Sequence, residues 1–137
     1  MRPRVHISAI SVAFMIAGVA LWLAPASGAQ SSSFRNAPPS AATTKNPYPS
    51  TSAAAAGKKL YAQNCAQCHG ANLRGMGPAP ALDSTSVRSA KPGELFWFIT
   101  KGKLESGMPS WANLPQPERW QIITFLQSPG STKTAAK

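Results

Sequence analysis

The pentapeptide CAQCH at residues 65–69 constrains this chain more than any other feature of its sequence. It contains both of the cysteines present in the 137 residues, so a framework of several disulfides is excluded. The only other histidine is His6, which leaves too few ligands for a four-coordinate zinc site. A thioredoxin-like redox pair would need a βαβ context, and the loop-rich sequence around the pentapeptide does not provide one.

The spacing within the pentapeptide favours covalent attachment of haem. In a helical turn Cys65 and Cys68 lie on one face, and His69, four residues after Cys65, stays on the same side. Two thioether bonds to the haem vinyl groups would fix the ring beside the histidine, so that an imidazole nitrogen reaches the iron at little further entropic cost. Chance placement of such rare residues is on the order of one in a thousand. We therefore expect one covalently bound haem c, with His69 as an axial ligand.

The first 29 residues are typical of an export signal. A basic start precedes an apolar run over residues 7–24, and small residues at 27–29 suit a signal peptidase. The alternative is an uncleaved membrane anchor, because the 18 residues from 7 to 24 approach the length of about 20 that a spanning helix needs. We expect a periplasmic protein that begins at Gln30, and membrane association only if this segment is retained.

Composition divides the remaining chain into three parts. Residues 30–52 are rich in Ser, Pro, Ala and Thr, which predicts an extended or mobile linker rather than a folded unit. Residues 53–128 hold enough apolar material for one compact domain. The tail over residues 129–137 is expected to be disordered.

The pattern within the domain predicts an all-α fold of three to four short helices and loops. Ser52 is a plausible N-cap for a helix over residues 53–64, which is rich in alanine. Residues 70–91 have loop chemistry with no sustained period. The Pro-Gly start and acidic first turn of 92–102 favour a short helix, although its apolar run also suits a buried strand. A last helix is expected over residues 117–127.

A second axial ligand decides whether the iron is open or closed. His-plus-Met ligation raises the reduction potential and closes the site, and beyond the export segment the chain offers only Met76 and Met108. Met108 lies between Gly107 and Pro109, which allow close approach and stiffen the loop. Met76 is flanked by glycines, seven residues from His69. Either methionine could instead fill a core gap; we expect Met108 to be the ligand.

From about Gly57 to Gln127 the chain resembles the class I cytochrome c family. The segments GKKLY at 57–61 and NCAQCHG at 64–70 look like the family's first helix and attachment site. In that family a glycine and an aromatic residue of the first helix meet an aliphatic and an aromatic residue of the last helix, which crosses it almost at right angles. The matching residues here are Gly57, Tyr61, Ile122 and Phe125.

The resemblance also implies a partner for the histidine and a methionine loop. A family proline offers its carbonyl to the other nitrogen of the ligand histidine; Pro80 matches it, with Leu82 against haem, and Pro78 is a second candidate. The Gly-Met-Pro segment before Trp111 matches the methionine loop of bacterial members. Five aromatic side chains would line the haem or simply form core: Phe96, Trp97, Phe98, Trp111 and Trp120.

The charge of the chain bears on its partners. Without Arg2 and Arg4 the 14 basic residues become 12, against 4 acidic residues, for a formal charge of +8. Such a surface suits nucleic acid, an anionic membrane or an acidic protein, but export argues against nucleic acid. With Lys101 and Lys103 just before the methionine loop, we expect redox protein partners with acidic docking surfaces. The alternative is that the lysines only keep the domain soluble.

Together these features predict a carrier or electron-transfer subunit rather than an enzyme. It would pass single electrons between a periplasmic dehydrogenase and an oxidase or other acceptor, through a His/Met-ligated haem. The alternative is a haem enzyme or gas sensor with a vacant or labile sixth position. Met108 distinguishes the two.

Overall fold

The structure is a computed structural model that describes residues 33–129. Across this range the secondary structure is helical, with isolated bridges and no strand, which confirms the all-α prediction. The elements run in the order η1 (Ser33–Asn36), α1 (Pro39–Thr43), α2 (Thr51–Asn64), α3 (Ala66–His69), α4 (Thr85–Arg88), α5 (Pro92–Lys101), η2 (Leu104–Ser106) and α6 (Gln116–Gln127). The predicted export segment and all of the predicted tail after Pro129 lie outside the described residues.

None of the described helices combines the length and the apolar character that a membrane-crossing helix needs.

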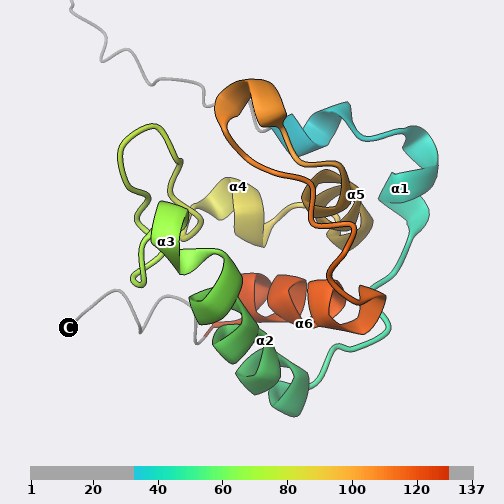
Figure 1. Ribbon diagram of the computed structural model, residues 1–137. Helices are drawn as coiled ribbons and strands as arrows, with labels where there is room; N and C mark the ends of the chain where they lie inside the picture. Colours follow the sequence, from blue (N-terminus) through green and yellow to red (C-terminus); the bar gives the residue numbers. More distant parts are fainter. Residues whose placement is uncertain (1–32, 130–137) are drawn as a thin grey trace, which may run out of the picture.

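The centre of the fold is the contact between α2 and α6, which cross in Figure 1. Gly57 lets the two backbones meet, because a Cβ atom at this position would lie 1.9 Å from the carbonyl oxygen of Gln121. One turn later the rings of Tyr61 and Phe125 pack with centroids 5.5 Å apart, and Ile122 is fully buried beside them. The helix pair expected from the family resemblance is therefore present.

The start of α2 differs from the sequence prediction by two residues. Ser50, rather than Ser52, is the N-cap, and its hydroxyl accepts a hydrogen bond from the backbone N–H of Ala53 at 3.1 Å. Both serines can act as caps, and an extended backbone at Ser50 (φ −104°, ψ 158°) decides between them.

The segment from Pro92 to Lys101 is helix α5, as predicted, and not a buried strand. Proline in the first turn, Glu94 near the N-terminus and Gly102 (φ 69°) after the last turn set its limits. It packs on α6 through Phe96, whose ring stacks on Trp120 with centroids 4.1 Å apart.

The prediction of an unpacked linker over residues 30–52 is wrong for the part that the structure describes. Helices η1 and α1, drawn in cyan in Figure 1, lie against α5. Phe34 is only 7% exposed and belongs to the main core cluster. Gly93 permits the contact with α1, since a Cβ atom there would lie 2.0 Å from the carbonyl oxygen of Ala41. We call residues 33–48 the N-terminal strap.

Hydrogen bonds continue the strap onto α6. Asn46 Nδ2 donates to the Thr124 hydroxyl at 2.8 Å and to the Trp120 carbonyl at 3.2 Å, while its Oδ1 accepts from the Tyr48 N–H at 2.8 Å. The Thr124 hydroxyl in turn donates to the Tyr48 carbonyl at 2.8 Å. Composition missed the strap because a few well-placed side chains, and not overall hydrophobicity, hold it.

The predicted loop over residues 70–91 contains one helical turn, α4. Ser84 caps it, accepting from the Val87 N–H at 3.4 Å, and Val87 is buried in the core. From α6, Gln127 Nε2 donates to the Ala90 carbonyl at 2.8 Å. A turn this short has no detectable period in the sequence, so only its tertiary contacts define it.

Candidate functional site

Cys65 lies between α2 and α3 and caps both helices, and the other four residues of the pentapeptide form α3. The Cys65 N–H donates to the Tyr61 carbonyl at 2.8 Å, and the His69 N–H donates to the Cys65 carbonyl at 2.9 Å. Cys65 is half-buried, Cys68 is exposed, and neither is in a disulfide. A helical turn brings residues three and four positions apart to the same side, which is why we expect both thiols and the imidazole to face one ligand.

Burial raises the pKa of the Cys65 thiol to about 11, and the neighbouring Cys68 adds to the rise. The thiol at this position is therefore neutral at ordinary pH. A thioether is also uncharged, so that forming one here removes no favourable charge and buries none. The half-buried environment of Cys65 fits a covalent sulfur link better than it fits a thiolate.

The imidazole of His69 is oriented by a backbone carbonyl. Its Nδ1 lies 2.9 Å from the carbonyl oxygen of Pro80, and a carbonyl can only accept, so Nδ1 carries the proton. Nε2 then has the free lone pair of a metal-binding imidazole. Of the two prolines considered from the sequence, Pro80 makes this contact.

The chain after the pentapeptide folds back so that Pro80 reaches the histidine. The Tyr61 hydroxyl donates to the Gly70 carbonyl at 2.7 Å. Leu73 is completely buried with a positive φ of 65°, and its carbonyl accepts from the N–H groups of Leu82 at 2.7 Å and Asp83 at 3.2 Å. Sequence reasoning missed Leu73, although an isolated apolar residue in a polar loop was a usable signal.

Met108 lies in the segment that follows α5, half-buried. It exchanges two backbone hydrogen bonds with Lys103, at 2.8 and 3.1 Å, which close residues 103–108 into a loop. Met76 is 57% exposed and belongs to the loop after α3. In Figure 1 the segment that follows α5 (orange) and α3 (green) are separate parts of the fold.

The five aromatic side chains predicted to line haem or form core divide into two groups. Phe96 and Trp120 stack on each other within the protein. Trp97, Phe98 and Trp111 are half-buried, as Phe96 is, and Phe98 also packs against the core cluster. Large apolar side chains left partly exposed, together with two thiols and an oriented imidazole, are the surroundings that a flat apolar metal cofactor requires. The residues present therefore fit haem c.

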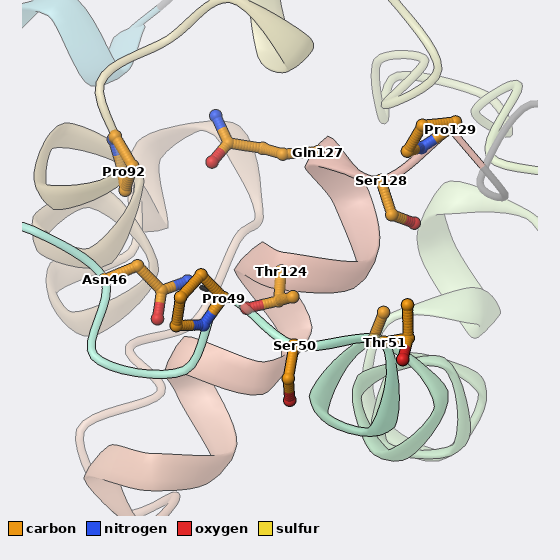
Figure 2. A pocket seen from close by; sticks show the side chains of 10 residues that line it. Asn46, Pro49, Ser50, Thr51, Pro92, Thr124, Gln127, Ser128 and Pro129 are labelled. Carbon is orange, nitrogen blue, oxygen red and sulfur yellow. Dashed lines mark hydrogen bonds between the residues drawn. The ribbon is translucent and has the colours of Figure 1, made fainter.

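Elsewhere, a hollow of about 340 Å³ lies where the start of α2 meets the end of α6. Figure 2 shows Asn46, Thr124 and Gln127 on its walls, with Pro49 and Pro92 nearby. The polar side chains among them already hydrogen-bond within the protein. None of the pentapeptide residues lines this hollow.

Comparison with known proteins places this arrangement in a family. Residues 52–126, more than half of the chain, match the family described as cytochrome c oxidase, cbb3-type, subunit III. This chain belongs to that family of c-type cytochrome domains. The cytochrome c domain is an electron-transfer unit that carries covalently bound haem c. The matched residues include α3 to α5, all but the first residue of α2 and all but the last residue of α6.

Individual relatives agree with this assignment. The cytochrome domain is 36% identical over 81 residues to the cbb3-type cytochrome c oxidase subunit CcoP of Rubrivivax gelatinosus. This alignment covers 58% of the chain but only 25% of that relative. Among solved structures, cytochrome CL of the marine methylotroph Methylophaga aminisulfidivorans is similar with a TM-score of 0.53 and 27% identity, over 67% of each chain.

Proposed function

We propose that this cytochrome c domain passes single electrons through a haem that Cys65 and Cys68 tether and that His69 and Met108 ligate. The observation that carries the proposal is the hydrogen bond between His69 Nδ1 and the Pro80 carbonyl. It fixes the ring orientation and leaves Nε2 for iron, on the same side as both thiols. Haem, when bound, supplies the one-electron couple.

The role of Met108 rests on the loop that holds it. The backbone hydrogen bonds between Lys103 and Met108, together with Pro109, give this loop a defined shape. A thioether is a suitable sixth ligand for a high-potential haem. With both His69 and Met108 as ligands, the iron would have no position open to substrate or gas. This coordination favours an electron carrier or electron-transfer subunit over a haem enzyme or sensor.

The relative from Rubrivivax gelatinosus is named as a subunit of a cbb3-type oxidase. We infer that this chain delivers electrons toward an oxidase, as a subunit or as a carrier, from a donor such as a periplasmic dehydrogenase. It would act in the periplasm after export, with membrane association if residues 1–29 are retained as an anchor.

Partner recognition is proposed to depend on charge. The chain has 14 basic and 4 acidic residues. Lys101 precedes the Met108 loop and Lys103 is its first residue, followed by Leu104, which is 81% exposed. Two lysines before an exposed apolar residue, with the acidic Glu105 after it, give this edge a net positive charge, which suits an acidic redox protein that binds briefly. Electron-transfer rates that stay constant as salt rises would contradict this.

The ligand assignment can be tested by spectroscopy of the purified oxidised haem protein. We expect a weak near-infrared band from methionine-to-iron charge transfer in the wild type, its loss in Met108→Ala, and its retention in Met76→Ala. The reduced wild type should not bind carbon monoxide readily, whereas Met108→Ala should. A band that survives in Met108→Ala and disappears in Met76→Ala would transfer the ligand role to Met76, and ready carbon monoxide binding by the wild type would favour the sensor or enzyme.

A further inference from the structure

Arg119 is a buried charged side chain that electron transfer does not by itself require. It is the fourth residue of α6 and is 9% exposed. Its Nε donates to the Leu114 carbonyl at 3.0 Å, its Nη1 donates to the Thr100 hydroxyl, and its guanidinium lies 4.6 Å from the centroid of the Phe96 ring. Among the described residues none of these partners is a carboxylate. Within residues 33–129, a carbonyl, a hydroxyl and an aromatic face offset the desolvation of the charge.

Thr100 connects Arg119 to the loop that carries Met108. The Thr100 hydroxyl, which accepts from Arg119, donates to the Phe96 carbonyl at 2.7 Å. The Thr100 carbonyl accepts from the Ser110 hydroxyl at 2.7 Å. A backbone hydrogen bond joins the same two segments, because the Trp111 N–H donates to the Ile99 carbonyl at 3.1 Å. The last turn of α5 thus holds the chain just after Met108.

The second contact of Arg119 is at the far end of the segment 102–113, which follows α5 and carries Met108. Leu114, whose carbonyl accepts from Nε, closes a turn by donating its N–H to the Trp111 carbonyl at 3.0 Å. One guanidinium therefore bonds to Thr100, before the segment, and to Leu114, after it. Both donors come from a rigid planar fork, which fixes the distance between the two attachment points.

We propose that Arg119 is a positioning residue that holds both ends of the segment 102–113, which carries Met108, and so keeps the methionine sulfur at the iron. This inference rests on the proposed ligation by Met108. Without the fork, the loop can move away from the haem while the helices remain folded, and an added ligand then competes more easily for the sixth position.

The test measures imidazole binding to the oxidised haem protein, because imidazole must displace the sixth ligand to bind. Losing a hydrogen bond from a charged donor corresponds to about tenfold or more in an equilibrium constant. We expect Arg119→Ala to bind imidazole at least about tenfold more tightly than the wild type, with a weaker near-infrared methionine band. Thr100→Val, which removes only the connecting hydroxyl, should change both in the same direction.

Two further variants distinguish the two-point hydrogen bonding of the guanidinium from its charge, and from the general effect of removing an arginine contact. Arg119→Lys keeps the charge without the fork, so it should resemble Arg119→Ala in imidazole affinity. Arg88→Ala is the matched control, because Arg88 also donates to a backbone carbonyl, that of Asp83, but lies on α4. It should bind imidazole like the wild type.

Wild-type imidazole affinity in Arg119→Ala and Thr100→Val, with only a lower unfolding temperature, would overturn the proposal, as would full rescue by Arg119→Lys. If Arg119→Ala yields no holoprotein, Thr100→Val decides alone.

Met108→Ala is measured in parallel. If it binds imidazole no better than the wild type, the ligation by Met108 fails. The positioning role of Arg119 is then tested by hydrogen exchange of the Met108 and Trp111 amides, which should be about tenfold faster in Arg119→Ala than in the wild type.

Discussion

Tyr61 lies at the junction of the core and the haem-attachment turn. Its ring packs against Phe125 in the contact between α2 and α6, and its hydroxyl donates to the Gly70 carbonyl, directly after His69. Burial raises the pKa of this phenol well above its usual 10, with a smaller contribution from Cys65. One side chain therefore couples the stability of the helix pair to the position of the pentapeptide.

This coupling predicts a pH dependence with a defined sign. Below pH 10 the phenol is neutral in both the folded and the unfolded chain, so its full contribution to stability is present. Above pH 10 the unfolded chain loses the proton and the folded chain keeps it, which lowers the free energy of unfolding by up to about 1.4 kcal/mol per pH unit. At pH 7 Tyr61→Phe should cost about 1–3 kcal/mol, because the Gly70 carbonyl loses its donor.

Urea unfolding of the two holoproteins checks this. The difference between wild type and Tyr61→Phe should narrow from pH 10 upward, since phenylalanine has no proton to lose. A difference that stays constant to pH 11 would show that Tyr61 is not protected from ionisation.

At the scale of elements, the crossing of α2 and α6 depends on Gly57 having no side chain. Helix propensity alone predicts that alanine would stabilise an interior helix position by about 1 kcal/mol relative to glycine. A Cβ atom at Gly57 would instead lie 1.9 Å from the Gln121 carbonyl oxygen, a backbone atom that cannot rotate away. The tertiary contact therefore overrides the local preference.

We expect Gly57→Ala to destabilise the holoprotein by about 1–3 kcal/mol or more, because the two helices must separate. The control is Ala55→Gly on the exposed face of the same helix, which should cost about 1 kcal/mol from propensity alone. Chemical unfolding measures both. A more stable Gly57→Ala variant would mean that the two helices do not touch at this point.

At the scale of the whole molecule, the folded unit is larger than the segment that matches the cytochrome family. The match covers residues 52–126, but the N-terminal strap places Phe34 in the same core as α6 and hydrogen-bonds Asn46 to Thr124. The strap lies over α5, the helix whose last turn holds the Met108 loop. It therefore supports the site indirectly, through α5.

Truncation of the strap anchor tests this extension. Phe34→Ala should lower the free energy of unfolding by about 3–5 kcal/mol, the usual cost of removing a buried aromatic ring. Arg35→Ala, at the exposed neighbouring position, should stay within about 0.5 kcal/mol of the wild type. If Phe34→Ala and the wild type are equally stable in thermal unfolding, residues 33–52 are a linker that does not pack on the domain.

The sequence by itself determined those features that depend on residues close together in the chain. The positions of Cys65, Cys68 and His69 on one side follow from the helical period. The limits of α5 follow from Pro92 and Gly102, because proline and glycine restrict or permit backbone angles locally. These features could be predicted because each depends on a few consecutive residues.

Only the tertiary structure decided the features that join distant segments. Pro80, and not Pro78, is the hydrogen-bond partner of His69 because of the way in which the loop folds back over buried Leu73. Both prolines offer the same carbonyl group, so the sequence does not distinguish them. The burial of Arg119 between Thr100 and Leu114, and of Phe34 in the core cluster, follows from contacts that composition does not encode. A long-range contact is a property of two surfaces that fit together, so neither segment alone contains the information.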